Sequence, residues 1–109
     1  MWYPILIALI GAYLLGNLNG SVCVSALVAD DDVRKHGSGN AGLTNFFRSY
    51  GGWNTLLVAM VDLIKTAVAC LLGGLVLEPY GLTREGMMLG AVAVSLGHDF
   101  PILLGFKGG

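Results

Sequence analysis

Charged residues are scarce in this chain. Asp, Glu, Lys and Arg make up 12% of its 109 residues, whereas apolar residues make up 55%. A soluble domain carries about 25% charged residues, so this composition is typical of an integral membrane protein. The formal net charge of -1 provides no basic field that would attract nucleic acid. We therefore expect a lipid bilayer, and no nucleic acid, as the partner.

Cysteine is also rare, and its two copies, Cys23 and Cys70, lie inside apolar runs. The sequence has no CxxC pair and no Cys/His spacing typical of a metal site, so both thiols are interpreted as small apolar side chains. We expect neither a metal nor a cofactor. No Lys or Arg occurs before Arg34, so the N-terminus lacks the basic region of a signal peptide and is interpreted as a retained transmembrane helix.

Three long apolar runs, at about residues 2–28, 53–77 and 85–104, dominate the sequence. Each is close to the ~20 residues that a helix needs to cross a bilayer. The sequence therefore predicts one all-α, polytopic transmembrane domain, with about three membrane-spanning helices in this chain. The first run holds a polar patch from Gly16 to Ser21 and is long enough to tilt or to break at its glycines.

The distribution of basic residues predicts the orientation. The connector at residues 30–52 holds three cations, and the N-terminal flank holds none. By the positive-inside rule this connector is cytoplasmic, the N-terminus lies outside, and Lys107 returns to the cytoplasmic side. The connector and the segment around Lys107, which are far apart in sequence, are then expected on the same side of the membrane.

The connector contains the run RKHGSGNAGLTNFFR, residues 34–48. Glycines leave backbone N–H groups open to an anion, Ser38 offers a hydroxyl, and Arg48 offers a two-pronged charged contact. The alternative is an ordinary loop whose cations only set the topology. The run is not a Walker A loop, because G-x-x-x-x-G-K-[ST] is absent. The candidate phosphate-binding residues of the connector are Gly37, Ser38, Gly39, Asn40, Thr44, Asn45 and Arg48.

A second polar segment, GHDFP at residues 97–101, precedes Lys107, Gly108 and Gly109. His98 is interpreted either as a general base or as a packed histidine at the membrane interface. Lys107 and the two glycines repeat the logic of the first loop and are further phosphate-binding candidates. The chain ends inside this motif, so we expect it to be an N-terminal portion of a longer protein.

Polar residues inside the apolar runs have several interpretations. Asp62 and Lys65 are three residues apart and can pair on one helix face; the alternatives are a structural ion pair, a Lys65 that reaches toward the interface, or a role in lining a site. Asn17 and Asn19 are interpreted as interhelical hydrogen-bonding groups, as a helix break, or as catalytic groups.

The two motifs resemble those of the bacterial acyl-phosphate:glycerol-3-phosphate acyltransferase family. The resemblance extends from about Tyr13 to Gly109, and RKHGSGNAGLTNFFR and GHDFPILLGFKGG stand in the expected order and separation. It implies an enzyme of about seven transmembrane helices in the bacterial inner membrane. That enzyme moves an acyl group from acyl phosphate to the 1-hydroxyl of glycerol 3-phosphate, giving lysophosphatidate and phosphate in the first step of phospholipid synthesis.

Carried over by motif, the resemblance implies that Ser38 and Arg48 contact substrate phosphate. Asn45 matches the amide of the family's Thr-Asn pair, and Lys107 and His98 match the lysine and histidine of the second motif. The implied catalytic set is Ser38, Arg48, Lys107 and His98. The sequence departs from the family at Asp99, where Asn is common, and at Leu43, where Ala is usual, and the family's third motif is absent from this chain.

The absence of certain catalytic residues from the sequence agrees with an acyl-phosphate donor. Acyl phosphate already carries a good leaving group, so the protein needs to position two anions and stabilise their charge. The His-x4-Asp dyad of acyl-CoA acyltransferases is absent. The alternatives are a small membrane subunit that binds or transports an anion or a lipid headgroup, and an inactive fragment.

Overall fold

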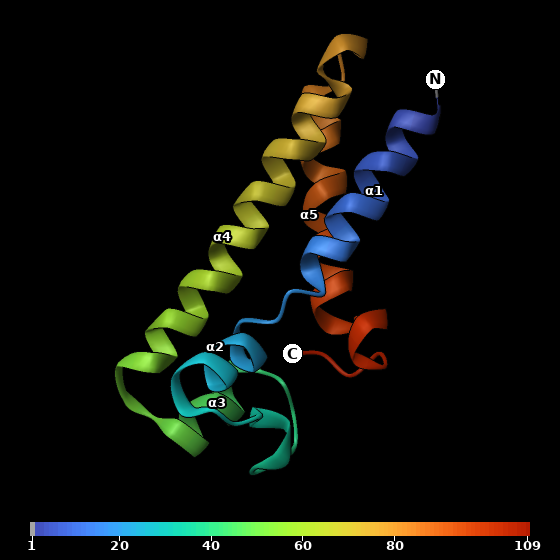
Figure 1. The fold of residues 1–109 in the computed structure, drawn as a ribbon. Coiled ribbons are helices and arrows are strands. Elements are labelled where there is room, and N and C mark those ends of the chain that lie inside the picture. Colours follow the sequence, from blue (N-terminus) through green and yellow to red (C-terminus); the bar gives the residue numbers. More distant parts are fainter. Residues whose placement is uncertain (1) are drawn as a thin grey trace.

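A computed structural model describes residues 2–109 of the protein, and within this range all of the regular elements are helices (Figure 1). The α-helices are α1 (Trp2–Gly16), α2 (Gly20–Ala29), α3 (Leu43–Tyr50), α4 (Gly52–Leu77) and α5 (Thr83–Asp99). Short 3-10 turns occupy Val33–Lys35, Glu78–Tyr80 and Ile102–Leu104. Three segments are long and apolar enough to cross a membrane: Trp2–Ala29, Gly52–Tyr80 and Thr83–Leu104. The predicted all-α class with three spans is confirmed.

The first apolar segment is not one continuous helix, as a span over residues 2–28 would imply. It breaks between Gly16 and Gly20, inside the polar patch of the first run. Asn19 adopts an extended conformation and its side chain accepts a hydrogen bond from Val22 N at 3.0 Å, which caps α2. The 15 residues of α1 rise about 22 Å, less than the ~30 Å of a hydrocarbon core. The break therefore brings polar backbone to membrane depth, where it needs partners.

Glycines allow α1, α4 and α5 to pack closely side by side (Figure 1). A Cβ on Gly97 of α5 would overlap the Tyr13 carbonyl oxygen of α1, and a Cβ on Gly73 of α4 would overlap the Gly86 carbonyl oxygen of α5. Small residues at such contacts are typical of helix pairs in membranes, where close van der Waals contact replaces the hydrophobic effect. This packing fixes the end of α5 against the end of α1.

The connector predicted at residues 30–52 contains an additional helix, α3, and a 3-10 turn. Phe46 of α3 packs with Val24, Val33 and Val58 in a small buried cluster that joins the connector to α2 and α4. The helix has only eight residues, too short for a periodic apolar pattern to reveal it. The connector is thus a folded unit and not an open loop.

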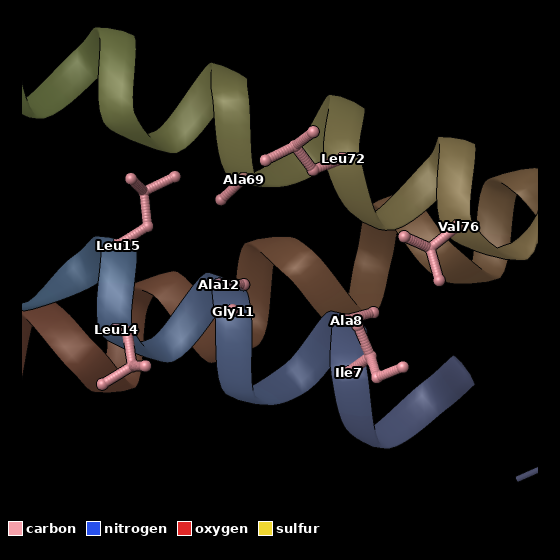
Figure 2. A pocket seen from close by; sticks show the side chains of 9 residues that line it. All are labelled: Ile7, Ala8, Gly11, Ala12, Leu14, Leu15, Ala69, Leu72 and Val76. Atoms are coloured by element: carbon pink, nitrogen blue, oxygen red, sulfur yellow. The ribbon is translucent and has the colours of Figure 1, made fainter. Parts of the chain in front are cut away.

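A cleft of about 500 Å³ lies between α1 and α4 (Figure 2). Its lining side chains are all apolar, with Ile7, Leu15 and Leu72 among them. A phosphate finds no donor on these side chains, so this cleft is not a candidate for the predicted anion site.

Candidate phosphate site where the two motifs meet

The side chain of Asn45 organises the connector. Its amide nitrogen lies within hydrogen-bond distance of three carbonyl oxygens, those of Val33 (3.2 Å), His36 (3.0 Å) and Asn40 (2.9 Å). Its oxygen accepts from Ser38 N at 3.2 Å, and the residue is only 2% exposed. Asn45 was predicted to contact phosphate; in this structure its amide is fully occupied by the connector's own backbone.

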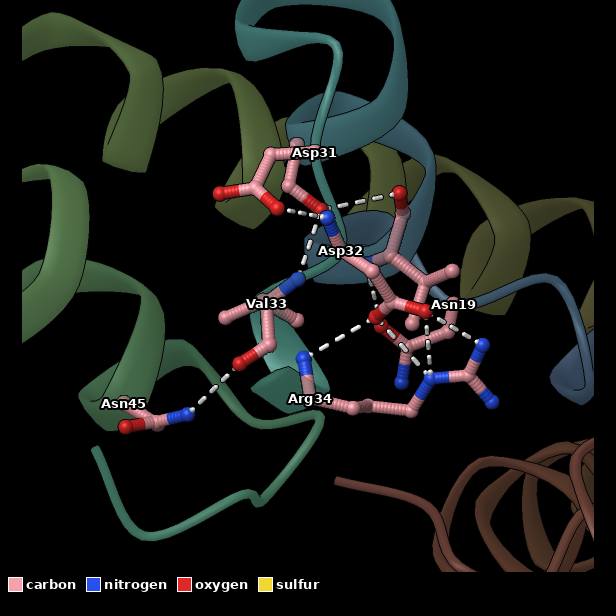
Figure 3. A network of polar contacts seen from close by, with 8 residues as sticks. Asn19, Asp31, Asp32, Val33, Arg34 and Asn45 are labelled. Atoms are coloured by element: carbon pink, nitrogen blue, oxygen red, sulfur yellow. Dashed lines mark hydrogen bonds and ion pairs between the residues drawn. The ribbon is translucent and has the colours of Figure 1, made fainter. Parts of the chain in front are cut away.

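Asp32 forms an ion pair with Arg34 at the start of the connector (Figure 3). Asp32 accepts from both Nε and Nη2 of Arg34, at 3.0 and 2.7 Å. This contact lowers the pKa of Asp32 to about 2 and raises the pKa of Arg34. Arg34 is therefore a structural cation that ties the 3-10 turn together.

Asp31 forms a second acidic contact, with His36 and Tyr50. Its Oδ2 lies 2.5 Å from His36 Nε2 and 2.9 Å from the Tyr50 hydroxyl. The pKa of Asp31 is lowered, first by the Asp32 backbone N–H and then by the Tyr50 and His36 contacts. The pKa of Tyr50 rises to about 12 through desolvation and through its bond to Asp31. No pattern in the sequence indicates this network, because its members are up to 19 residues apart.

The cation and hydroxyl that the sequence favoured most, Arg48 and Ser38, remain exposed. Arg48 and Thr44 are four residues apart on α3 and so project from the same side of this helix. Within residues 2–109, no carboxylate lies within ion-pair distance of Arg48. Among the residues that the structure describes, the Ser38 hydroxyl accepts a hydrogen bond from Asn40 N alone, at 3.3 Å. Both groups are open to a ligand.

The N-terminus of α3 adds backbone donors to the connector. Gly42 is the N-cap and makes no side-chain capping bond. The first N–H groups of a helix have no intrahelical acceptor, and the helix dipole gives this end partial positive charge. Such an end binds phosphate and other anions, and Gly42 brings no side chain to it.

The second motif reaches this same end of α3. A Cβ placed on Gly42 would lie 3.0 Å from Asn40 Nδ2 and 3.7 Å from the carbonyl carbon of Gly109. Gly109 N in turn donates to the His98 carbonyl oxygen at 3.1 Å. Figure 1 shows the C-terminal end of the chain between the end of α5 and the α2–α3 region. The two motifs, about fifty residues apart in sequence, thus meet in space.

The segment after α5 is held in this position by α1. The Tyr13 hydroxyl donates to the Phe100 carbonyl oxygen at 2.5 Å and accepts from Ile102 N at 2.9 Å. Asn17 Oδ1 accepts from Leu103 N at 2.9 Å, and its Nδ2 lies 3.3 Å from the Gly97 carbonyl oxygen. The interpretation of Asn17 as an interhelical hydrogen-bonding group is confirmed. The contribution of Tyr13 was missed, because a tyrosine in an apolar run gives no sign of its partner.

Lys65 and Asp62 supply the partners that the helix break requires. Lys65 Nζ donates to the carbonyl oxygens of Gly16 (3.1 Å) and Leu18 (2.8 Å) at the end of α1. Asp62 Oδ1 accepts from Gly20 N, at the start of α2, at 3.0 Å and lies 3.1 Å from Lys65 Nζ. A cation at a helix C-terminus and an anion at a helix N-terminus both match the helix dipoles. The predicted ion pair is present, and it joins the two halves of the first span.

Lys65 also lies 2.8 Å from His98 Nδ1. The pair lines a cavity of about 240 Å³ together with Asp62, Thr66, Val94, Ser95 and Asp99. Lys107 is exposed, and among residues 2–109 no hydrogen bond joins it to Ser38 or Arg48. The structure therefore brings together four residues of the two motifs: His98, Gly109, Gly42 and Asn40. Three more residues of the same motifs are exposed to solvent: Ser38, Arg48 and Lys107.

Comparison with known proteins agrees with this arrangement. The sequence profile described as glycerol-3-phosphate acyltransferase matches residues 6–109. Glycerol-3-phosphate acyltransferases of Alkaliphilus metalliredigens and Neisseria meningitidis are 36% and 41% identical over 104 and 98 residues, which is 95% and 90% of this chain. These segments are 51% and 49% of the relatives, so the chain spans about half the length of the curated relatives it matches.

A solved structure shows the same fold. The crystal structure of PlsY, an integral membrane glycerol 3-phosphate acyltransferase in its glycerol 3-phosphate form, superposes with a TM-score of 0.74 at 35% sequence identity. The match covers 96% of this chain and 50% of that one. The profile match over nearly the whole sequence, the curated relatives and the shared fold establish that this chain belongs to the glycerol-3-phosphate acyltransferase family.

Proposed function

We propose that this chain forms the phosphate-binding part of an enzyme that transfers an acyl group from acyl phosphate to the 1-hydroxyl of glycerol 3-phosphate. The products are lysophosphatidate and inorganic phosphate. The observation that carries the proposal is the position of Gly109, which lies between His98 and the N-terminus of α3 at Gly42. Both substrates are phosphate anions, and this is the place where residues of the two motifs come together.

Charge neutralisation and positioning are the chemistry that these residues support. Arg48 has no acidic partner among the described residues and offers a planar pair of donors to a phosphate. Ser38 and the first N–H groups of α3 would orient the phosphate oxygens, and Lys107 would balance the second charge. Acyl phosphate carries its own leaving group, so the hydroxyl of glycerol 3-phosphate attacks the acyl carbon directly and no protein nucleophile is needed. The new ester bond forms as the bond between the acyl carbon and the phosphate oxygen breaks, and the hydroxyl proton leaves with the inorganic phosphate.

The membrane context supports a lipid product. Large apolar side chains such as Leu27, Trp53 and Leu63 are 85%, 84% and 69% exposed, as expected for helices surrounded by acyl chains. We propose that the connector faces the cytoplasm, where the three basic residues of residues 30–52 would retain it. The long-chain product would then form at the inner-membrane surface.

The test is acyl transfer in membranes from labelled acyl phosphate to glycerol 3-phosphate. It uses the 109-residue chain and a chimera in which this chain replaces the matching half of the Alkaliphilus metalliredigens relative. Arg48→Ala in the chimera should lower kcat/KM by about 100-fold or more, because charge-assisted hydrogen bonds contribute about 1.5 to 3 kcal/mol each. Arg84→Ala removes an equal charge from the first turn of α5 and should leave transfer unchanged.

Two results would contradict the proposal. One is a folded chimera, with the helix content of its parent, that transfers no acyl group from acyl phosphate. The other is full activity in Arg48→Ala. Binding of glycerol 3-phosphate without transfer in any form would instead favour the second candidate, a membrane subunit that recognises a phosphate headgroup, because Arg48 and the α3 N-terminus require no chemistry to hold an anion.

A further inference from the structure

Lys65 is the most deeply buried cation among the described residues. It is 3% exposed, and three oxygen atoms surround its Nζ: the Gly16 and Leu18 carbonyls and the carboxylate of Asp62. His98 Nδ1 is the fourth neighbour, at 2.8 Å. Three oxygen acceptors, one of them a carboxylate, match the three N–H donors of a lysine ammonium.

The ammonium determines where His98 carries its proton. A lysine ammonium has three donors and no acceptor, so an imidazole nitrogen in contact with it must be the acceptor. The three ammonium hydrogens are shared among four neighbours, and an N–H group on Nδ1 would point at the cation. The contact therefore favours an unprotonated Nδ1, with the ring proton of a neutral histidine on Nε2. The other ionisable groups near this contact are carboxylates, those of Asp62 on α4 and Asp99 on α5, which line the same cavity; α1 and α2 present backbone groups to Lys65 and Asp62.

Nε2 of His98 faces the second motif. A Cβ on Gly109 would overlap Nε2 and would lie 2.7 Å from Cε1 and 3.2 Å from Cδ2. Only glycine fits against this edge of the ring. Because Gly109 also neighbours Gly42 at the N-terminus of α3, the Nε2 edge of His98 lies at the place where the two motifs meet.

We propose that Lys65 is a positioning residue that holds His98 in its Nε2–H form, so that His98 is a hydrogen-bond donor to a phosphate anion at the second motif and not a general base. The identity of the anion rests on the function proposed above, whereas the protonation state of the ring does not. Lys65 itself would not touch the substrate; it acts through His98 and is held by the two helix ends and Asp62. The same ion pair that joins α1 to α2 thus links the helix break to the site.

The first test reads the ring nitrogens directly. The 15N resonances of histidine-labelled protein are recorded in lipid nanodiscs at pH 8, with a His36→Gln variant to assign the two histidines. The wild type should show Nδ1 of His98 unprotonated and Nε2 protonated. Lys65→Met should shift the Nδ1 resonance, because it removes the donor. The control Thr66→Val lines the same cavity and should shift it little. A protonated Nδ1 in the wild type, or an Nδ1 resonance that is the same in Lys65→Met, would overturn the proposal.

The second test reads the donor role with glycerol 3-phosphate as the probe and glycerol as the control ligand. The amide N–H of Gln can reach the position of Nε2, whereas the amide of Asn, one methylene shorter, reaches only the position of Nδ1. His98→Gln should therefore bind within about threefold of the wild type, and His98→Asn about tenfold more weakly. Lys65→Met should lose affinity by about threefold, with Thr66→Val unchanged.

The two tests can contradict different parts of the proposal. Equal affinity in His98→Gln and His98→Asn would overturn the donor role while leaving the proposed reaction intact. Absence of any glycerol 3-phosphate binding by the wild-type chain would count against the donor role and the proposed substrate together, and the 15N result would still decide whether Lys65 sets the protonation of His98. If Lys65→Met does not fold, the wild-type Nδ1 resonance alone remains decisive.

Discussion

Asn45 provides the sharpest test of how the connector is built. Asn45→Asp keeps the size of the side chain and the acceptor for Ser38 N, but it removes both amide hydrogens and turns an oxygen toward the Val33, His36 and Asn40 carbonyls. Two amide hydrogens serve these three oxygens, so two hydrogen bonds are lost. At about 1 to 1.5 kcal/mol each, the connector should lose about 2 to 3 kcal/mol of local stability.

Hydrogen exchange measures this loss. A local cost of about 2 to 3 kcal/mol corresponds to a rise of about 30- to 150-fold in the opening equilibrium of the connector. Exchange at Ser38 and its neighbours should accelerate by that factor, while exchange in the middle of α4 stays the same. Asn40→Asp is the matched control, because it adds the same charge to the same connector at an exposed residue whose side chain makes no hydrogen bond among residues 2–109.

The result also separates two roles for Asn45. If its amide contacts substrate phosphate and not the backbone, Asn45→Asp weakens binding of glycerol 3-phosphate but leaves exchange unchanged. Equal exchange rates in Asn45→Asp and Asn40→Asp would therefore refute a structural role for the Asn45 amide.

Two further predictions concern packing and pH. Gly97→Ala should destabilise the helix bundle by about 1 to 3 kcal/mol in thermal unfolding in detergent, because its Cβ would overlap α1, whereas Gly11→Ala meets no atom within 4 Å and should be neutral or slightly stabilising; equal effects would contradict the close packing. The pKa of Asp32 is about 2 in the folded protein and about 3.9 when unfolded, so its contact with Arg34 should stabilise the connector at every pH above about 4 and be lost as the pH falls toward 2. Asp32→Asn should remove this part of the pH dependence of hydrogen exchange in the Val33–Lys35 turn, and an unchanged profile would show that another carboxylate causes it.

Composition and run length predicted most of the fold. Three apolar runs of about the bilayer thickness give three spans, because lipid leaves a backbone no partner other than its own helix. The position of the break was also readable, since Asn17 and Asn19 interrupt the first run. The helix α3 could not be predicted, because eight residues are too few to show a periodic apolar pattern. Its stability comes from the packing of Phe46 on residues of α2 and α4.

The sequence predicted which types of residue form the candidate site, but it did not predict the role of each residue. Glycine, hydroxyl and cation in one connector indicated an anion, but that indication included Asn45 with Arg48 and did not show which cations of the run, Arg34 or Arg48, already have a partner. The structure separates them by competition: Asp32 lies close enough to occupy Arg34, and the backbone of residues 33–40 occupies Asn45. Spacing along a chain does not show which polar group has already found a partner.

The helix break shows how far this limitation extends. Asp62 and Lys65 were readable as an ion pair from their i, i+3 spacing, but nothing in the sequence indicates that their partners are the end of α1 and the start of α2. If the first span were one continuous helix, its backbone would need no side-chain partners from Asp62 and Lys65. If the helix did not break, Asp62 and Lys65 would find no free backbone groups to bind inside the membrane. The break and the ion pair therefore depend on each other. Because Lys65 contacts His98 and Asn17 binds Gly97 and Leu103, a substitution at the break should affect the proposed phosphate site through these two side chains.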